Sequence, residues 1–217
     1  MTLTLQGSLL DQLDQLEAGA GSEVGPAPLA GRVRRTRLSR GAWLDVLPGW
    51  LPAADALFER LVHAVPWRAE QRQMYERVVD VPRLVRFYGE DEPLPDAALV
   101  AARDALDEHY VPQVREALRT AGMCFYRDGR DSVAWHGDTI GRGRTEDTVV
   151  AIVSLGAPRT LLLRPRGGGT TLRHSLGHGD LLVMGGSCQR TWEHCVPKTA
   201  RPVGPRISVQ FRPLGVR

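Results

Sequence analysis

The sequence of 217 residues is poor in cysteine and has no long apolar run. Its three cysteines are few and odd in number, which favours a reducing compartment over a disulfide scaffold. No stretch approaches the roughly 18 unbroken apolar residues of a membrane helix. Residues 1–16 have no basic segment ahead of an apolar run, which argues against an export signal. We therefore expect a cytoplasmic protein with no membrane contact.

Lysine is almost absent, since Lys198 is the only lysine among the 28 basic residues. Arginine binds carboxylates and phosphates with two parallel hydrogen bonds, so an anionic ligand is one interpretation and GC-rich codon usage is the other. Hydrophobic residues make up 42% and charged residues 24%, as in ordinary globular proteins, which excludes a disordered or fibrous chain. No repeat, Walker motif, zinc pattern of cysteine and histidine, or Gly-x-Ser-x-Gly motif is present.

The expected elements divide the chain into a helical part and a strand-rich part. Residues 1–40 contain Gly/Pro breaks and a run of arginines, and we expect them to be peripheral. Apolar spacing predicts helices over residues 51–65 and 96–109, with Pro112 forcing a turn or a new helix. After residue 122, eight short apolar runs are separated by glycine and proline, at 124–127, 133–136, 148–155, 160–164, 170–174, 180–184, 190–196 and 206–212.

This order of elements predicts one α+β domain over residues 41–217. Its helical or lid part covers residues 41–121, and its core covers residues 122–213. The core is expected to be a jelly roll, that is, a double-stranded β-helix with the N-terminal helices packed on one face.

His136 and Asp138 lie two residues apart, so on a strand they point to the same face. With His194 they supply two imidazoles and one carboxylate, the facial triad of non-haem Fe(II) oxygenases. A His-x-Asp pair alone is weak evidence, and His178-Gly179-Asp180 is a second copy. We interpret that copy as a turn into the strand that follows. His194 has a plainer interpretation too, as a hydrogen-bonded histidine without a ligand.

The last predicted strand carries a second chemical signal. Alternation places Arg206, Ser208, Gln210 and Arg212 on one face of it. Inward arginines are costly without anionic partners, and a dicarboxylate such as 2-oxoglutarate would supply two carboxylates. The alternative is a charged outer face on an edge strand.

Two neighbouring features receive structural interpretations. Trp135 points away from the face that carries His136, so we expect it in the core. Gly167-Gly168-Gly169 lies between two predicted strands rather than before a helix, and we interpret it as a hairpin loop, not a phosphate site.

Taken in order, these motifs resemble the AlkB family of Fe(II)/2-oxoglutarate dioxygenases. The resemblance covers roughly residues 80–213 and includes the segments Pro82–Gly89, Phe125–His136 and Gly179–Gly186. It implies Fe(II) ligands, namely His136, Asp138 and His194. It also implies a 2-oxoglutarate site in which Arg206 pairs with the far carboxylate, Arg212 with the carboxylate near the metal, and Tyr126 donates a hydrogen bond.

The chain departs from the family pattern at two places. Cys124 stands where the family has an asparagine two residues before the tyrosine. Family members that repair DNA carry acidic residues just after His-x-Asp, where this chain has Thr139-Ile140-Gly141-Arg142. The first departure bears on cosubstrate affinity, and the second bears on the identity of the substrate.

The function implied by the resemblance is oxidative demethylation of N-alkylated nucleic acid bases in DNA repair, with O2 consumed and formaldehyde, succinate and CO2 released. The same chemistry on RNA, tRNA or another substrate is the first alternative, and an inactive jelly-roll binding protein is the second. A base must leave the duplex to react, so stacking side chains are expected. We assign this role to Tyr75 with Arg72 and Arg77; packing between helices and sheet is the alternative. We expect a monomer.

Overall fold

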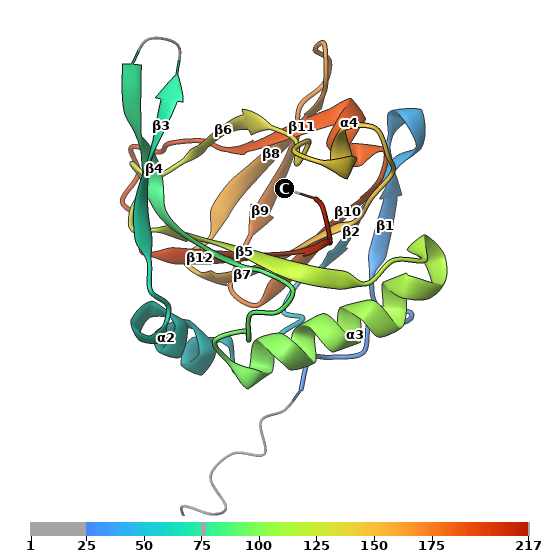
Figure 1. The fold of residues 1–217 in the computed structure, drawn as a ribbon, viewed down its shortest axis with the longest axis horizontal. Helices are drawn as coiled ribbons and strands as arrows, with labels where there is room; N and C mark the ends of the chain where they lie inside the picture. Colours follow the sequence, from blue (N-terminus) through green and yellow to red (C-terminus); the bar gives the residue numbers. More distant parts are fainter. Residues whose placement is uncertain (1–24, 75–76, 217) are drawn as a thin grey trace, which may run out of the picture.

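In the computed structural model of the chain, residues 25–74 and 77–216 are described, with residues 71–74 and 77–80 described by their backbone alone. Two antiparallel sheets face each other within this part of the chain (Figure 1). The larger sheet has the spatial order β1 (Arg34–Arg37), β2 (Ala42–Leu47), β10 (Asp180–Gly186), β7 (Val150–Gly156), β12 (Arg206–Pro213), β5 (Leu118–Tyr126), β4 (Arg77–Tyr88) and β3 (Arg68–Met74). The smaller sheet has the order β6 (Val133–His136), β11 (Trp192–Val196), β8 (Arg159–Pro165) and β9 (Leu172–Leu176).

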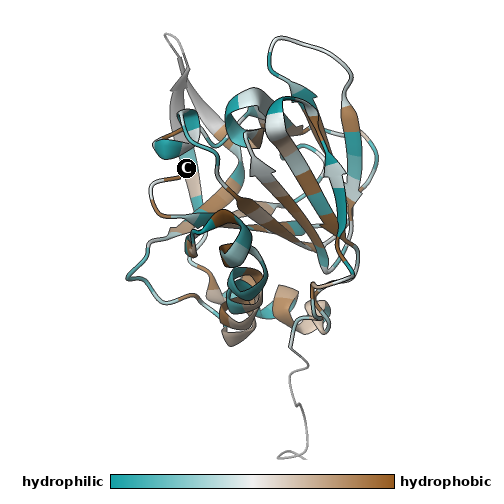
Figure 2. Cartoon of the chain, turned by 90° about the vertical axis from the view of Figure 1, so that its right-hand side faces the viewer, coloured by the Kyte–Doolittle hydropathy of each residue, from teal (hydrophilic) through white to brown (hydrophobic). Residues whose placement is uncertain are grey.

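Two long helices cover the outer face of the larger sheet. They are α2 (Ala54–Ala64) and α3 (Ala97–Val114), which lie together on one side of the molecule in Figure 1. Their buried leucines pack with Ile207, Val209 and Phe211 of β12 in one apolar cluster. In Figure 2 hydrophobic residues appear as brown bands along the strands, interspersed with hydrophilic ones. The expected jelly roll with N-terminal helices on one face is confirmed.

The short helical segments lie near the ends of the smaller sheet or beside β2. They are η1 (Ser39–Gly41), η2 (Arg142–Arg144) and α4 (Cys188–Thr191). None of the helices in the described ranges is both long and apolar enough to cross a membrane. All eight strands expected after residue 122 are present, with limits shifted by up to six residues, since β5 begins at Leu118.

The expected break at Pro112 is wrong, because α3 continues through this proline to Val114. A proline in the last turn removes only one backbone hydrogen bond, and Arg115 then ends the helix in the left-handed conformation with its N–H donated to Val111 O at 2.7 Å.

The part that we expected to be helical also contains three strands, β2 to β4, and β1 lies in the segment that we expected to be peripheral. Proline is unusual inside a strand, so Pro82 weakens the strand pattern of β4 in the sequence. The structure places Pro82 where the pairing of β3 with β4 shifts register, so the missing N–H falls at an irregularity of the ladder. Leu29 is buried in the core and β1 pairs with β2, so the packed body begins before the expected limit at residue 41. Residues 1–24 lie outside the described part.

Asp45 on β2 is a buried carboxylate that joins the edge of the larger sheet to α3. It accepts two hydrogen bonds from Arg35, both at 2.7 Å, and one from the hydroxyl of Tyr110 at 2.9 Å. Burial raises the pKa of Tyr110, with the Asp45 charge acting in the same direction, so this phenol stays a donor.

We expect Tyr110→Phe to lower the free energy of unfolding by about 1–2 kcal/mol, because it removes one hydrogen bond to a buried charge. Tyr88→Phe is the matched control, since the buried hydroxyl of Tyr88 has no partner among the described residues. Urea denaturation of both variants measures the difference. Equal stability losses in the two variants would contradict the role given to the Asp45 contact.

Candidate metal centre and anion pocket

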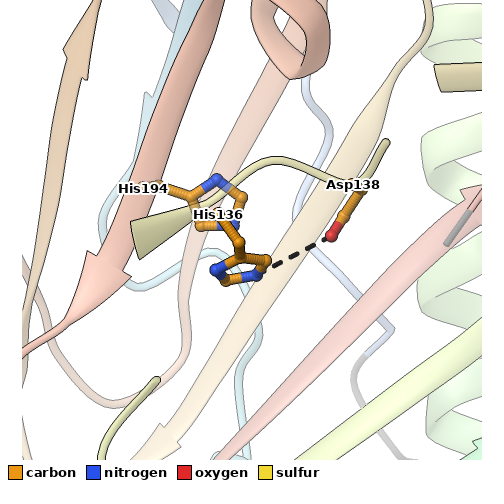
Figure 3. Close-up of side chains that lie close together, drawn as sticks. All are labelled: His136, Asp138 and His194. Carbon is orange, nitrogen blue, oxygen red and sulfur yellow. Dashed lines mark ion pairs between the residues drawn. The ribbon is translucent and has the colours of Figure 1, made fainter. Parts of the chain in front are cut away.

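Strand pairing brings the three predicted metal ligands together. His194 on β11 lies directly opposite His136 at the end of β6. Asp138 follows two residues later, and one ligand atom from each of the three side chains lies within 4.8 Å of the others (Figure 3). His136 Nε2 is 3.8 Å from Asp138 Oδ1. His194 and Asp138 are buried and His136 is partly exposed, so the trio lies at an opening of the fold.

Neighbouring groups hold each ligand in a defined orientation. His136 Nδ1 lies 2.8 Å from the carbonyl oxygen of Ala134, which makes this nitrogen the donor and leaves Nε2 free to bind a cation. The backbone N–H of Asp138 donates to Gln189 Oε1 at 2.9 Å, and Arg212 Nε donates to Asp138 Oδ2 at 2.8 Å. A Cβ at Gly137 would collide with the backbone oxygen of Gln189, so glycine allows this loop to lie against α4.

The protonation states suit a divalent cation. Burial lowers the pKa of His194 to about 3, helped by the neighbouring His136, and burial also lowers the pKa of His136. Burial would raise the pKa of Asp138, but the Arg212 guanidinium and the two imidazoles together outweigh it and the pKa falls to about 2. Two neutral imidazoles and one carboxylate therefore face each other at neutral pH, the donor set of a non-haem iron site.

The inner face of β12 lines the same cavity. Arg206, Ser208, Gln210 and Arg212 all border it, while the alternate residues of β12 enter the apolar core. The predicted alternation is confirmed, and the alternative of an edge strand is wrong because β12 lies between β7 and β5. Asp138 is the only carboxylate among the described residues that line the cavity. The cavity is therefore rich in cations.

Arg206 is the strongest sign of an anionic ligand. Its side chain is 1% exposed, and its Nε donates to Ser154 Oγ at 2.8 Å. Its Nη1 is buried without a hydrogen-bond partner among the described residues. Tyr126 lies beside it, with the Arg206 Cζ 5.3 Å from the ring centroid. An unpaired buried guanidinium nitrogen is costly, and a carboxylate would satisfy it, so the donor set fits Fe(II) together with an oxo-dicarboxylate.

Sequence reasoning missed three residues of this site. Gln189 orients Asp138 from α4, and no motif marks it. Arg83 on β4 is a third guanidinium of the cavity, with Nε donating to Cys124 Sγ at 3.3 Å and Nη1 to Ser132 O at 3.1 Å. It lies in the Pro82–Gly89 segment, to which the resemblance to the AlkB family had already drawn attention. Gly122 was also missed; a Cβ there would meet the Arg212 side chain.

Cys124 borders the cavity, in line with the family position that it occupies. Its thiol accepts from Arg83 and lies 3.9 Å from Gln210 Oε1. The thiol is therefore one of the polar groups that line the cavity, and it lies on β5 opposite Ser208, between Arg206 and Arg212 in the sequence of β12.

The second His-Gly-Asp copy lies outside the cavity. His178 Nδ1 accepts from the backbone N–H of Gly156 at 2.7 Å. The carboxylate of Asp180 accepts from the N–H groups of Gly49 and Gly177 at 2.8 and 2.7 Å. Both side chains therefore stabilise turns, which confirms the structural interpretation.

Two other interpretations have different outcomes. The residues 167–169 form the loop between β8 and β9, with positive φ angles of 87°, 98° and 133°, as expected for a hairpin loop.

The expectation that Trp135 lies in the core is wrong. It is partly exposed, and the guanidinium of Arg164 stacks 4.0 Å from its ring centroid, because a short edge strand leaves its outer face uncovered. The side chains of Arg72, Tyr75 and Arg77 lie outside the described residues.

Comparisons with known proteins agree with this geometry. The sequence matches the 2OG-Fe(II) oxygenase superfamily over residues 89–212. It is 30% identical over 190 residues to alpha-ketoglutarate-dependent dioxygenase alkB homolog 3 of Homo sapiens, covering 76% of this chain and 64% of that protein. It is 30% identical over 187 residues to the DNA oxidative demethylase ALKBH2 of Homo sapiens, covering 74% of this chain and 69% of that protein.

The chain spans about 64% of the length of the alkB homolog 3 proteins of cattle and mouse, at 31% and 32% identity. A prolyl hydroxylase from Trichoplax adhaerens, solved with a hypoxia inducible factor peptide, has a TM-score of 0.56 at 13% identity. The alignment covers 78% of this chain and 83% of that one, and it supports the fold alone. The chain belongs to the 2OG-Fe(II) oxygenase superfamily and, within it, to the AlkB-like proteins.

Proposed function

We propose that this chain is an Fe(II)- and 2-oxoglutarate-dependent oxidative demethylase of N-alkylated nucleic acid bases. His136, Asp138 and His194 would hold Fe(II). Arg206 and Tyr126 would bind the far carboxylate of 2-oxoglutarate. The observation that carries the proposal is the unpartnered buried Nη1 of Arg206, which lines the same cavity as the His-Asp-His trio.

When bound, Fe(II) and 2-oxoglutarate supply with O2 an oxidant that hydroxylates a C–H bond, with release of succinate and CO2. The chain supplies ligands, orientation and exclusion of water. Three protein ligands leave coordination positions for the cosubstrate and O2. Arg212 helps to keep Asp138 ionised and fixes one of its oxygens, and it would also face the cosubstrate carboxylate near the metal.

The substrate class is supported by the relatives, one of which is described as a DNA oxidative demethylase. An N-methyl group that is hydroxylated decomposes to formaldehyde and the unmodified base, which makes formaldehyde the diagnostic product. A second candidate is the same chemistry on RNA or tRNA. It is favoured by the segment after Asp138, which has Thr139-Ile140-Gly141-Arg142 at the positions where repair members carry acidic residues. In this segment Ile140 is 67% exposed, and Arg142 pairs with Glu116 and Glu146.

We expect His136→Ala and Asp138→Ala each to abolish succinate formation and to weaken Mn(II) binding, since each removes one of three protein ligands. His178→Ala is the matched control, because it removes the histidine of the second His-Gly-Asp copy. Succinate is measured by coupled assay, and Mn(II) by electron paramagnetic resonance. Turnover that survives in His136→Ala, or that is lost in a folded His178→Ala, would contradict the assignment.

We expect Arg206→Met to raise the KM for 2-oxoglutarate by about 10- to 100-fold, the range for loss of a charge-assisted hydrogen bond. The kcat at saturating cosubstrate should fall much less, because Arg206 contacts no metal ligand. Succinate formation at varied 2-oxoglutarate measures both constants. An unchanged KM would place the cosubstrate elsewhere in the cavity.

The substrate is tested by formaldehyde release from N1-methyladenine and N3-methylcytosine placed in single-stranded DNA, duplex DNA and tRNA. We expect release from DNA, most readily from the single strand, because no base pair must then be opened. Release from RNA alone would favour the second candidate. Succinate formation without release from any of the three would overturn the proposed substrate class and leave the oxygenase chemistry intact.

A further inference from the structure

Arg159, the first residue of β8, is a buried cation with no carboxylate partner among the described residues. Its side chain is 4% exposed and donates to the backbone carbonyls of Asp128 (2.9 Å), Asp131 (2.8 Å) and Pro197 (2.9 Å). The carboxylates of Asp128 and Asp131 are already paired with Arg130 and Arg127. A neutral donor could serve these carbonyls without the cost of burying a charge, so the buried charge points to a role beyond packing.

The three carbonyls belong to segments that frame the site. Residues 127–132 connect Tyr126 at the end of β5 to β6, the strand that carries His136. Pro197 follows β11, the strand that carries His194. One guanidinium therefore ties the segment after the cosubstrate tyrosine to the segment after a predicted metal ligand.

Arg159 also contacts the ring of Tyr126. Its Cζ lies 5.5 Å from the ring centroid, and the Cζ of Arg206 lies 5.3 Å from the same centroid. Tyr126 and Arg206 line the cavity, whereas Arg159 does not. Arg159 can therefore act on a ligand through the electric field of its charge and through the position of Tyr126. Its charge adds to that of Arg206 on the two sides of the Tyr126 ring.

We propose that Arg159 is a positioning residue for the far carboxylate of 2-oxoglutarate. It holds Tyr126 and residues 127–132 beside Arg206, and its charge favours 2-oxo acids that carry a second carboxylate. The proposal rests on the proposed function, since that function supplies the cosubstrate.

The test compares two ligands in the full chain loaded with Mn(II), without nucleic acid. The ligands are 2-oxoglutarate and 2-oxopentanoate, which has the same carbon chain but lacks the far carboxylate. Calorimetric titration of Arg159→Met should show 2-oxoglutarate binding weakened by about tenfold, as for the loss of one charge near a partly buried pocket. Binding of 2-oxopentanoate and of Mn(II) should change less than about twofold. Arg159→Lys should keep most of the discrimination between the two acids.

Arg173→Met is the matched control, because Arg173 is exposed on β9, the strand paired with β8. If Arg159→Met does not fold, Arg159→Gln, which keeps a donor for the carbonyls without the charge, gives the same comparison. Wild-type affinity for 2-oxoglutarate in the neutral variants, or an equal loss for both acids, would overturn the proposal while the proposed function stands. Failure of the wild-type protein to bind 2-oxoglutarate would overturn both.

Discussion

The constraint on which the site depends is a set of buried or partly buried guanidinium groups between the two sheets. Arg206 and Arg212 face inward from a central strand, and Arg83 faces the same cavity from β4. Burying such charges is tolerated only with hydrogen-bonded or anionic partners. The structure supplies one carboxylate, Asp138, and leaves Arg206 Nη1 without a partner in the described part of the chain. The cavity is therefore built for an additional anion.

Arg212 links that anion pocket to the candidate metal centre, because it donates to Oδ2 of Asp138, whose Oδ1 faces His136. Gly122 on the adjoining strand leaves room for its side chain. On the other side, Gln189 holds the backbone of Asp138, so the carboxylate is fixed from two directions. The two histidines face each other because antiparallel pairing sets His136 opposite His194. The predicted metal ligands and the anion donors thus derive their positions from the same two sheets.

Much of this site could be predicted from local pattern. Alternation along residues 206–212 assigned the inward row, because side chains of a strand alternate between its faces. The spacing of His136 and Asp138 predicted a shared face. Contacts that depend on tertiary packing could not be predicted from the local sequence. Gln189 and Arg159 are examples, because their partners are backbone groups far away in the sequence. The strands β1 to β4 were missed for a related reason, since charged residues and Pro82 mask their pairing.

The central claim is most directly tested by a crystal structure of the chain grown with Mn(II) and 2-oxoglutarate under anaerobic conditions. The account predicts the metal bound by His136 Nε2, Asp138 and His194, with a carboxylate of the cosubstrate on Arg206 Nη1. A metal bound at another group, or a cosubstrate that leaves Arg206 Nη1 without a partner, would contradict it.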